Sequence, residues 1–303
     1  MDSWVLFLLA AAAGTCLAAA PPDVALPVDE LQRVTISTGD LAGIIGNHAD
    51  HGAGKAGYIG VHSLTHTAEP ENLFVPRYAG LINRRNRAAV VRLNSTEALL
   101  AHFDNGEPRL HVRYRVAAPH YVDVEMRAMS SGGAIHLNSA SYMNGPPDRH
   151  IYFIDPDGRW QKHLDTEHGN AASVFPAGAP LPVLKTVPNA RFKHGTNSFS
   201  DSVSRWRYDP KYAFYYGRFR DMVFIQMFPP RCGVIFYMSP TGGGSQPDGR
   251  PNPAWDWRGR FDTSAAQGEW GALRMRVVYK KYVSDDDCLH EYLKWTNSES
   301  VSP

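Results

Sequence analysis

The sequence has almost no net charge, few cysteines and no long apolar run beyond its first residues. A formal net charge of +1 over 303 residues gives no electrostatic reason to expect nucleic acid or an anionic membrane as a partner. The sequence contains no CxxC pair, so a structural zinc site is not expected. It also lacks a GxSxG elbow, a P-loop and a dinucleotide fingerprint. We therefore expect no cofactor.

Beyond Cys16, the sequence has two cysteines, Cys232 and Cys288. They could form one disulfide in an oxidising compartment. Alternatively, both are small buried hydrophobes, because Cys232 opens an apolar strand and Cys288 lies on the apolar side of a terminal helix. Both alternatives remain open at this stage.

The first residues have the layout of a secretory signal. Residues 4–13 are apolar and are followed by small residues, and the run is too short to span a bilayer. We expect a signal peptide over residues 1–20, with a lipoprotein signal acylated at Cys16 as the alternative. The expected location is secreted or periplasmic. Residues 21–303 show neither an internal repeat nor a low-complexity linker, so we predict a single domain without a membrane span.

Several segments alternate apolar and polar residues with a period of two, which is typical of strands. Residues 109–117 and 121–129 each have one apolar face and are predicted to pair as a hairpin. Residues 273–282 repeat the pattern, and the more continuously apolar residues 221–228 and 233–238 are expected to be central strands.

Turn and helix signals complete this pattern. The run 155–158, Asp-Pro-Asp-Gly, predicts a hairpin tip. Only residues 284–295 have a complete helix start signal, with Ser284 as the cap, Asp287 three residues later, and Val283 and Cys288 at the positions of a hydrophobic staple. The sequence thus predicts an all-β fold closed by a short C-terminal helix. The Gly- and Pro-rich residues 239–253 form either a functional loop or a disordered insertion.

Several stretches resemble galactose mutarotase-like proteins. Residues 57–86 contain Ser63-Leu64, a Gly turn and Asn83-Arg84, and residues 268–282 resemble the closing strand of that group. The runs HLNSASYMNGPPDRHIYF, YYGRFRDMVFIQMF, SPTGGG and NPAWDW are similar to those of an exported, largely uncharacterised bacterial group with the same fold. The resemblance implies a galactose mutarotase-like β-supersandwich and a sugar-related context. The two histidines and late glutamate of mutarotases have no matching motif here. Their nearest counterparts are His136, His168 and Glu269, so mutarotation itself is not expected.

Sugar sites combine aromatic surfaces with polar groups that fix the hydroxyls. The NPAWDW run offers Trp255 as an aromatic platform and Asp256 as a hydroxyl acceptor, although tryptophan is more often buried in a core. In residues 215–222, Tyr216, Arg218 and Arg220 alternate on one face of a predicted strand. We expect Tyr216 and Arg218 to hold an acidic sugar, with a solvated, ion-paired face as the alternative.

Catalysis, if present, is expected from residues upstream of this run. His136, Tyr142 and His168 are the candidate catalytic residues, because a base and a tyrosine near an arginine would suit a polysaccharide lyase. Arg84 and Asn144 are further candidates for substrate binding, and structural hydrogen bonding by Tyr142 and Asn144 is the alternative. The histidines at 48, 51, 62 and 66 lack acidic ligands at a recognisable spacing, so we predict no metal site.

The sequence leads to two functional hypotheses. The first is an exported protein that binds a saccharide in a groove and acts on it as a lyase, epimerase or hydrolase. The second is a non-catalytic module that recognises a polysaccharide for a partner enzyme. The oligomeric state is not predicted.

Overall fold

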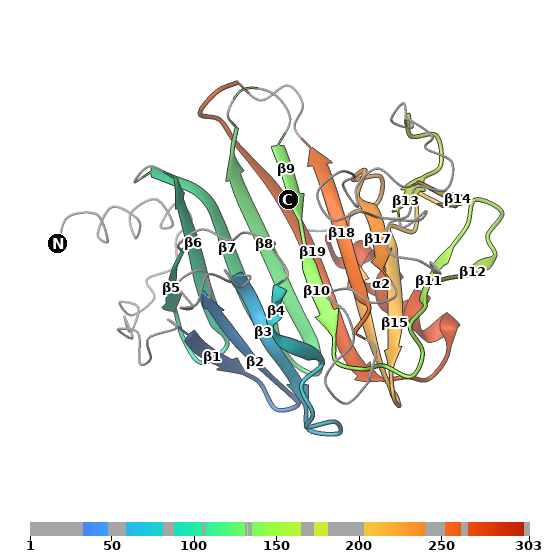
Figure 1. The fold of residues 1–303 in the computed structure, drawn as a ribbon, viewed down its shortest axis with the longest axis horizontal. Helices are drawn as coiled ribbons and strands as arrows, with labels where there is room; N and C mark the ends of the chain where they lie inside the picture. Colours follow the sequence, from blue (N-terminus) through green and yellow to red (C-terminus); the bar gives the residue numbers. More distant parts are fainter. Residues whose placement is uncertain are drawn as a thin grey trace, which may run out of the picture.

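The computed structural model describes residues 33–47, 59–80, 88–104, 107–130, 132, 135–164, 173–180, 203–239, 252–261 and 266–299. These residues form three β-sheets and one α-helix (Figure 1). The all-β prediction with a C-terminal helix is therefore confirmed. The expected signal peptide, Arg84, His168 and residues 240–251 of the Gly-rich segment lie outside the described residues.

The largest sheet has nine strands and contains the predicted hairpin. In sheet order its strands are β12 (Trp160–His163), β11 (Ile151–Ile154), β15 (Phe214–Phe219), β16 (Met222–Met227), β19 (Trp270–Lys281), β8 (Tyr121–Met129), β7 (Glu107–Ala117), β6 (Glu97–Asp104) and β5 (Ala88–Arg92). β7 and β8 form the predicted hairpin, with Val116 opposite Val122. β16 lies centrally and is buried along its whole length, as its continuous apolar run predicted.

The second sheet has seven strands and carries the NPAWDW run. Its order is β14 (Val203–Tyr208), β13 (Ser173–Pro176), β17 (Ile235–Ser239), β18 (Ala254–Phe261), β10 (Ala140–Met143) and β4 (Phe74–Gly80), and β9 (Ile135–Asn138) also pairs with β18. A third sheet consists of β1 (Arg33–Ser37), β2 (Leu41–Asn47) and β3 (Ile59–His66).

The main core lies between the seven-stranded and nine-stranded sheets. Phe236 of the smaller sheet packs against Tyr215 and Phe153 of the larger one, with ring centroids 4.7 and 6.2 Å apart. Trp255 lies directly over Gly217, and a Cβ atom added to that glycine would come within 2.5 Å of the indole ring. The approach of the two sheets at this point therefore depends on a residue without a side chain.

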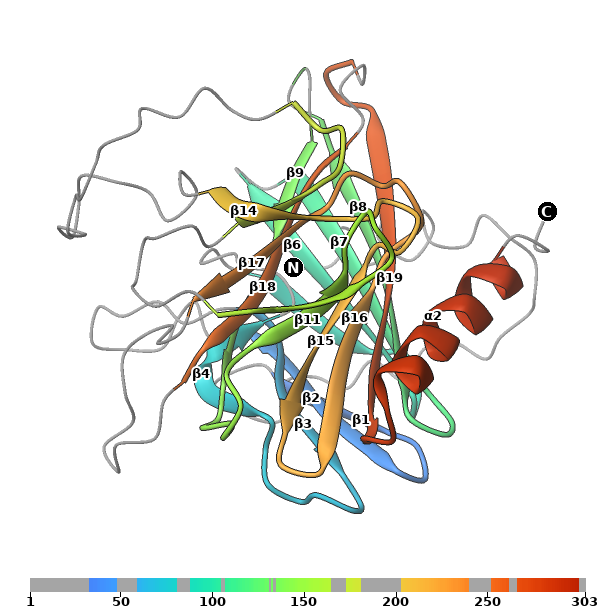
Figure 2. The ribbon, with the colours of Figure 1, turned by 90° about the vertical axis from the view of Figure 1, so that its right-hand side faces the viewer.

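Helix α2 (Asp285–Glu299) covers the outer face of the nine-stranded sheet, on the side away from β17 and β18 (Figure 2). Ser284 caps it as predicted, because its Oγ accepts a hydrogen bond from the Asp287 amide at 3.1 Å. The predicted hydrophobic staple is wrong, since Val283 is 69% exposed while Cys288 is buried under the helix. Asp287 does not close a capping box and instead pairs with Lys280.

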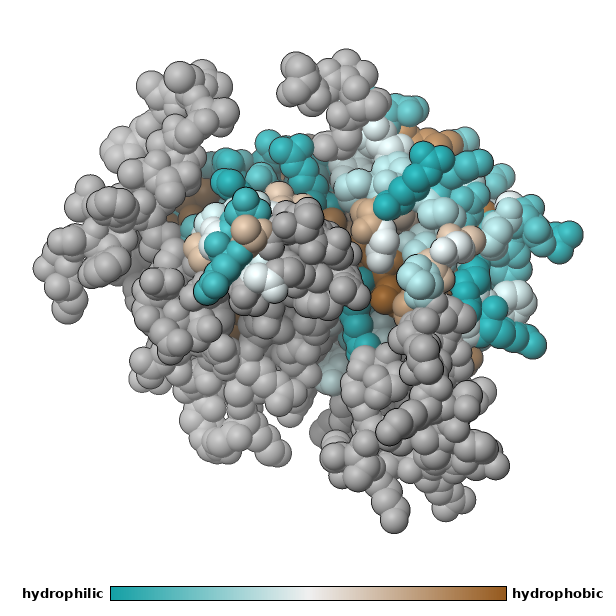
Figure 3. Space-filling view, turned by 90° about the horizontal axis from the view of Figure 1, so that it is seen from above, coloured by the Kyte–Doolittle hydropathy of each residue, from teal (hydrophilic) through white to brown (hydrophobic). Residues whose placement is uncertain are grey.

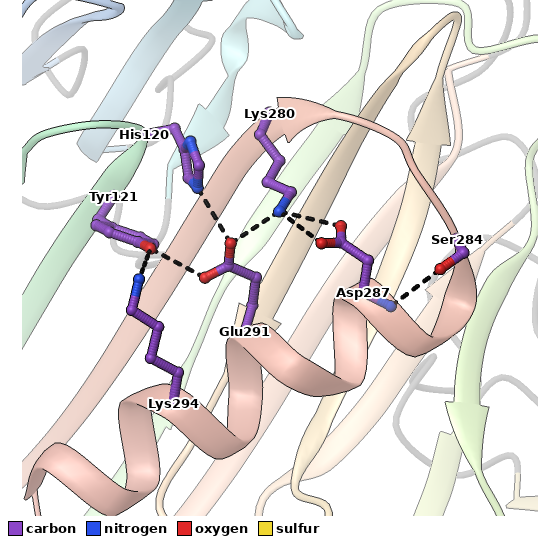
Figure 4. Close-up of polar contacts among 7 residues, drawn as sticks. All are labelled: His120, Tyr121, Lys280, Ser284, Asp287, Glu291 and Lys294. Atoms are coloured by element: carbon purple, nitrogen blue, oxygen red, sulfur yellow. Dashed lines mark hydrogen bonds and ion pairs between the residues drawn. The ribbon is translucent and has the colours of Figure 1, made fainter.

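Figure 4 shows the polar network that holds α2 to the sheet. Glu291 accepts hydrogen bonds from Lys280 Nζ at 2.8 Å and from Tyr121 Oη at 3.0 Å, and it lies 3.2 Å from His120 Nε2. Lys294 Nζ donates to Tyr121 Oη at 3.1 Å. The side chain of Glu291 is only 11% exposed, so the helix is fixed by charge-assisted hydrogen bonds that are largely shielded from water.

Cys232 is half-buried, Cys288 is fully buried, and both are free thiols, which favours the small-hydrophobe alternative. In the part of the chain that the structure describes, no helix is long and apolar enough to cross a membrane.

Candidate functional site

Strand β18 brings three of the predicted site residues onto neighbouring strands. It pairs with β9 through Arg260 and His136, and with β10 through Ala254 and Tyr142. Asp256 lies on β18 itself, opposite Tyr237 of β17. His136, Tyr142 and Asp256 therefore belong to one sheet, as a shared site requires.

Alternation along β18 decides which side chains can reach a ligand. Trp255 and Trp257 point into the core and have no exposed surface. Asp256 and Arg258, one residue out of phase, point to the outer face of the seven-stranded sheet. The expectation that Trp255 offers a platform beside Asp256 is therefore wrong, because neighbouring residues of a strand face opposite sides. The Trp255 indole instead donates to the Arg149 carbonyl at 3.0 Å.

Asp256 is held by one of its two carboxylate oxygens. Its Oδ1 accepts hydrogen bonds from the Ser141 amide at 2.6 Å and from the Ser141 hydroxyl at 3.1 Å. Its Oδ2 accepts no hydrogen bond from any residue that the structure describes. The residue is only 7% exposed, so one oxygen is fixed in a largely dehydrated position and the other is left for a further partner.

The surroundings of Asp256 bring its titration close to neutral pH. Burial raises the pKa of its carboxyl to about 7, although the hydrogen bonds from Ser141 and the charge of Arg258 pull it the other way. A carboxyl that is half-ionised near neutral pH can both accept and return a proton. Buried carboxyls with such raised pKa values are concentrated at functional sites.

An arginine and an aromatic ring lie on the same outer face as Asp256. The guanidinium of Arg258 lies 4.3 Å from the ring centroid of Tyr237, which is the cross-strand neighbour of Asp256. Sequence reasoning missed Ser141, Tyr237 and Arg258. Arg258 could have been found from its position, because residues two apart on a strand share a face.

Asn144 and the segment around Arg220 are tied into the structure. Asn144 Nδ2 donates to Glu71 Oε1 at 3.1 Å and to the Asn72 carbonyl at 3.0 Å, as the structural alternative for this residue expected. Arg220 does not lie on a strand with Arg218. It adopts a positive φ of 56° in the turn after β15 and forms ion pairs with Glu69 and Glu71.

Tyr216 and Arg218 share a face, as predicted. That face is the outer face of the nine-stranded sheet, on the opposite side of the molecule from Asp256. Tyr215, the residue before Tyr216, points into the core, and its hydroxyl donates to the Asp256 carbonyl at 2.6 Å. Tyr216 points outward beneath α2, is fully buried and stacks on Tyr152 with ring centroids 4.9 Å apart. A single groove that contains both Arg218 and Asp256 is therefore excluded, because both sheets lie between them.

A hollow of about 240 Å³ lies on the outer face of the nine-stranded sheet beside Trp295. Arg113 and Arg115 of β7 and Arg274 of β19 line it, and acids pair with the two arginines of β7. Arg113 pairs with Glu97 at 2.6 Å, and Asp123 contacts Arg115 at 3.1 Å and Arg276 at 2.6 Å. We interpret this region as a cross-strand ladder of ion pairs rather than a ligand site.

The described surface contains little exposed hydrophobic area. In Figure 3 the hydrophobic areas are small and lie among hydrophilic side chains. Among the described residues, the exposed large hydrophobic residues are Val283 and Leu293. No group of three or more histidine, cysteine or acidic side chains in the described residues is arranged to hold a metal ion.

Comparison with known proteins gives no assignment. No family model matches the sequence, and no curated protein matches it either. The solved structure of HI1317 is 8% identical over 86% of this chain and 100% of its own, with a TM-score of 0.40. A mutant of heparan sulfate lyase HepC from Pedobacter heparinus is 11% identical over 88% of this chain, with a TM-score of 0.42, and this chain spans 38% of its length. Likenesses this weak decide neither the family nor the function.

Proposed function

We propose that this protein is exported and binds a saccharide on the outer face of the seven-stranded sheet, where Asp256 exchanges a proton with the bound sugar. The observation that carries the proposal is the state of the Asp256 carboxyl. One oxygen is fixed by Ser141, the other is left for a ligand, and the pKa is about 7.

The neighbours of Asp256 suit a sugar better than an apolar ligand. A carboxylate oxygen and a guanidinium supply an acceptor and donors that can fix hydroxyl groups, and the guanidinium lies over the Tyr237 ring. Arg258 would also neutralise a carboxylate on the sugar, because a guanidinium matches that group geometrically.

Among the described residues, Asp256 is the one acid whose pKa is raised, which favours a lyase or epimerase over a hydrolase. Glycoside hydrolysis ordinarily requires two carboxyls that flank the bond. Glu269, the counterpart of the late mutarotase glutamate, is exposed in the turn before β19, in the other sheet, and does not form such a pair with Asp256. In a lyase reaction, the Asp256 carboxylate would take the proton beside the sugar carboxylate, and the electron pair would form a C=C bond. The C–O bond to the departing sugar would then break, and the departing oxygen would take up a proton.

The test is a panel of neutral, uronate and sulfated oligosaccharides, with binding followed by calorimetry and products by mass spectrometry. Asp256→Asn should abolish product formation while retaining binding within about tenfold, because the amide oxygen still accepts from Ser141. Asp157→Asn, an exposed acid in the β11–β12 turn, is the matched control and should change neither.

The outcomes separate the two functional hypotheses. Product released by the parent protein and not by Asp256→Asn supports the enzyme. Binding that depends on Asp256 and Arg258 without any product would replace the enzyme by a recognition module. If no saccharide binds at millimolar concentration, both must be abandoned.

A further inference from the structure

Arg218 is a partly buried cation without an acidic partner. Its guanidinium lies 4.1 Å from the ring centroid of Tyr282, at the start of α2. No ion pair joins Arg218 to any residue that the structure describes, and its Nε is buried with no acceptor. Partial burial of an unpaired charge is costly, so such an arrangement calls for a compensating anion.

Asp285, the first residue of α2, is hydrogen-bonded to Tyr282 and is already engaged. Asp285 Oδ1 accepts hydrogen bonds from Tyr216 Oη at 2.5 Å and from Tyr282 Oη at 2.6 Å. The two tyrosines therefore hold Asp285 in place, and one of them carries the Arg218 guanidinium on its ring. Arg218 and Asp285 therefore both contact Tyr282 but form no ion pair with each other.

The other nearby acid is engaged as well. Asp148 accepts from Tyr152 Oη at 2.5 Å, lies 2.6 Å from His150 Nδ1, and has Lys162 Nζ at 3.7 Å. Lys162 Nζ also lies 5.4 Å from the Tyr152 ring centroid. Tyr152 is close enough to Arg218 for the guanidinium to lower its pKa, against the larger effects of burial and Asp148. Lys162 thus lies over the ring of Tyr152, which stacks on Tyr216, two residues before Arg218 on β15.

We propose that Arg218 forms a binding site for an oxyanion group, the sulfate ester or carboxylate of a saccharide. The site lies on the outer face of the nine-stranded sheet and is separate from Asp256. Stacking on Tyr282 holds the guanidinium in one orientation, so its planar fork is preorganised for an oxyanion. The inference does not rest on the proposed function, because both sheets separate the two sites.

Calorimetry at low, constant ionic strength tests the site with four probes: a sulfated oligosaccharide, a uronate oligosaccharide, a neutral oligosaccharide of the same length and inorganic sulfate. The two acidic saccharides should bind the parent protein. Arg218→Lys keeps the charge but loses the fork, so their affinity should fall about 10- to 100-fold. Arg218→Met should remove the binding, while affinity for the neutral saccharide should not change in either variant.

Two controls make the result specific. Arg205 is exposed on β14 and also lies over an aromatic ring, 4.8 Å from the Trp206 centroid, so Arg205→Met should leave oxyanion binding intact. Asp256→Asn should do the same, which keeps failure of this site distinct from failure of the proposed function. Inorganic sulfate that binds as tightly as the saccharides would assign the site to a free oxyanion.

Two results would overturn the inference. The first is that no acidic probe binds at millimolar concentration. The second is that both Arg218 variants bind the acidic saccharides as the parent does but melt more than about 5 °C lower, which would make Arg218 a structural residue. If Arg218→Met does not fold, the charge-conserving Arg218→Lys still decides between these results.

Discussion

Replacing Glu291 with glutamine should weaken the hydrogen bonds and the ion pair that hold α2 to the nine-stranded sheet. Burial raises the pKa of Glu291, but the hydrogen bonds from His120, Lys280 and Tyr121 and the charge of Lys280 outweigh it and lower the pKa to about 2. The difference from the ordinary value of 4.5 corresponds to about 3 kcal/mol of stability at neutral pH. Glutamine keeps part of the hydrogen bonding, so we expect Glu291→Gln to cost about 2 to 3 kcal/mol.

The loss of stability caused by Glu291→Gln should depend on pH, whereas the loss caused by a general packing defect would not. Since the pKa of Glu291 is lower in the folded state, its contribution is complete above about pH 4.5 and is lost as the pH falls towards 2. The stability difference between the parent protein and Glu291→Gln should therefore shrink over that range.

Urea denaturation followed by tryptophan fluorescence at several pH values measures the difference. Asp286→Asn is the matched control, because Asp286 lies exposed on the same helix and should cost about 0.5 kcal/mol or less through the helix dipole. A loss below 1 kcal/mol for Glu291→Gln at pH 7, or a loss that stays constant down to pH 2.5, would refute the assigned role of the network.

Three further predictions concern the core, a turn and the candidate site. Gly217→Ala should destabilise the protein by about 3 kcal/mol in urea denaturation, because its Cβ would meet the Trp255 ring at 2.5 Å. Asp155→Ala should cost about 2 to 3 kcal/mol by the same assay, since the carboxylate accepts two backbone hydrogen bonds of the β11–β12 turn and a third from Gln161. Asp256→Asn should stabilise the unliganded protein by about 2 kcal/mol at pH 8, an advantage that develops as the pH rises from about 4 to 7, because the raised pKa makes ionisation unfavourable in the folded state. Equal melting temperatures of parent and Asp256→Asn at pH 5 and pH 8 would contradict this third expectation.

Local patterns were sufficient to predict individual elements. Alternation over residues 109–129 predicted the β7–β8 hairpin, and the Asp-Pro-Asp-Gly run predicted the β11–β12 turn, where Gly158 has a φ of 77°. Ser284 likewise indicated the start of α2. These features depend on contacts between residues close in the sequence, which a pattern can encode.

Pairings between distant strands could not be predicted in this way. Tyr216 and Arg218 were correctly placed on one face, but nothing in residues 214–219 shows that α2 covers that face or that β11 is the neighbouring strand. The error at Trp255 was avoidable, because strand alternation alone separates Trp255 from Asp256. Strand β6 is likewise fixed by its neighbours, because β5 and β7 pair with it on either side.

The Asp256 carboxyl itself offers the most direct test of the candidate site. Its ¹³Cγ chemical shift, assigned with Asp256→Asn, can be followed from pH 4 to pH 9 with and without each oligosaccharide of the panel. We predict a titration midpoint near 7 in the free protein, which should move when a saccharide that binds is added. A midpoint near 4, or a midpoint near 7 that no bound saccharide changes, would contradict a role for Asp256 in the sugar site.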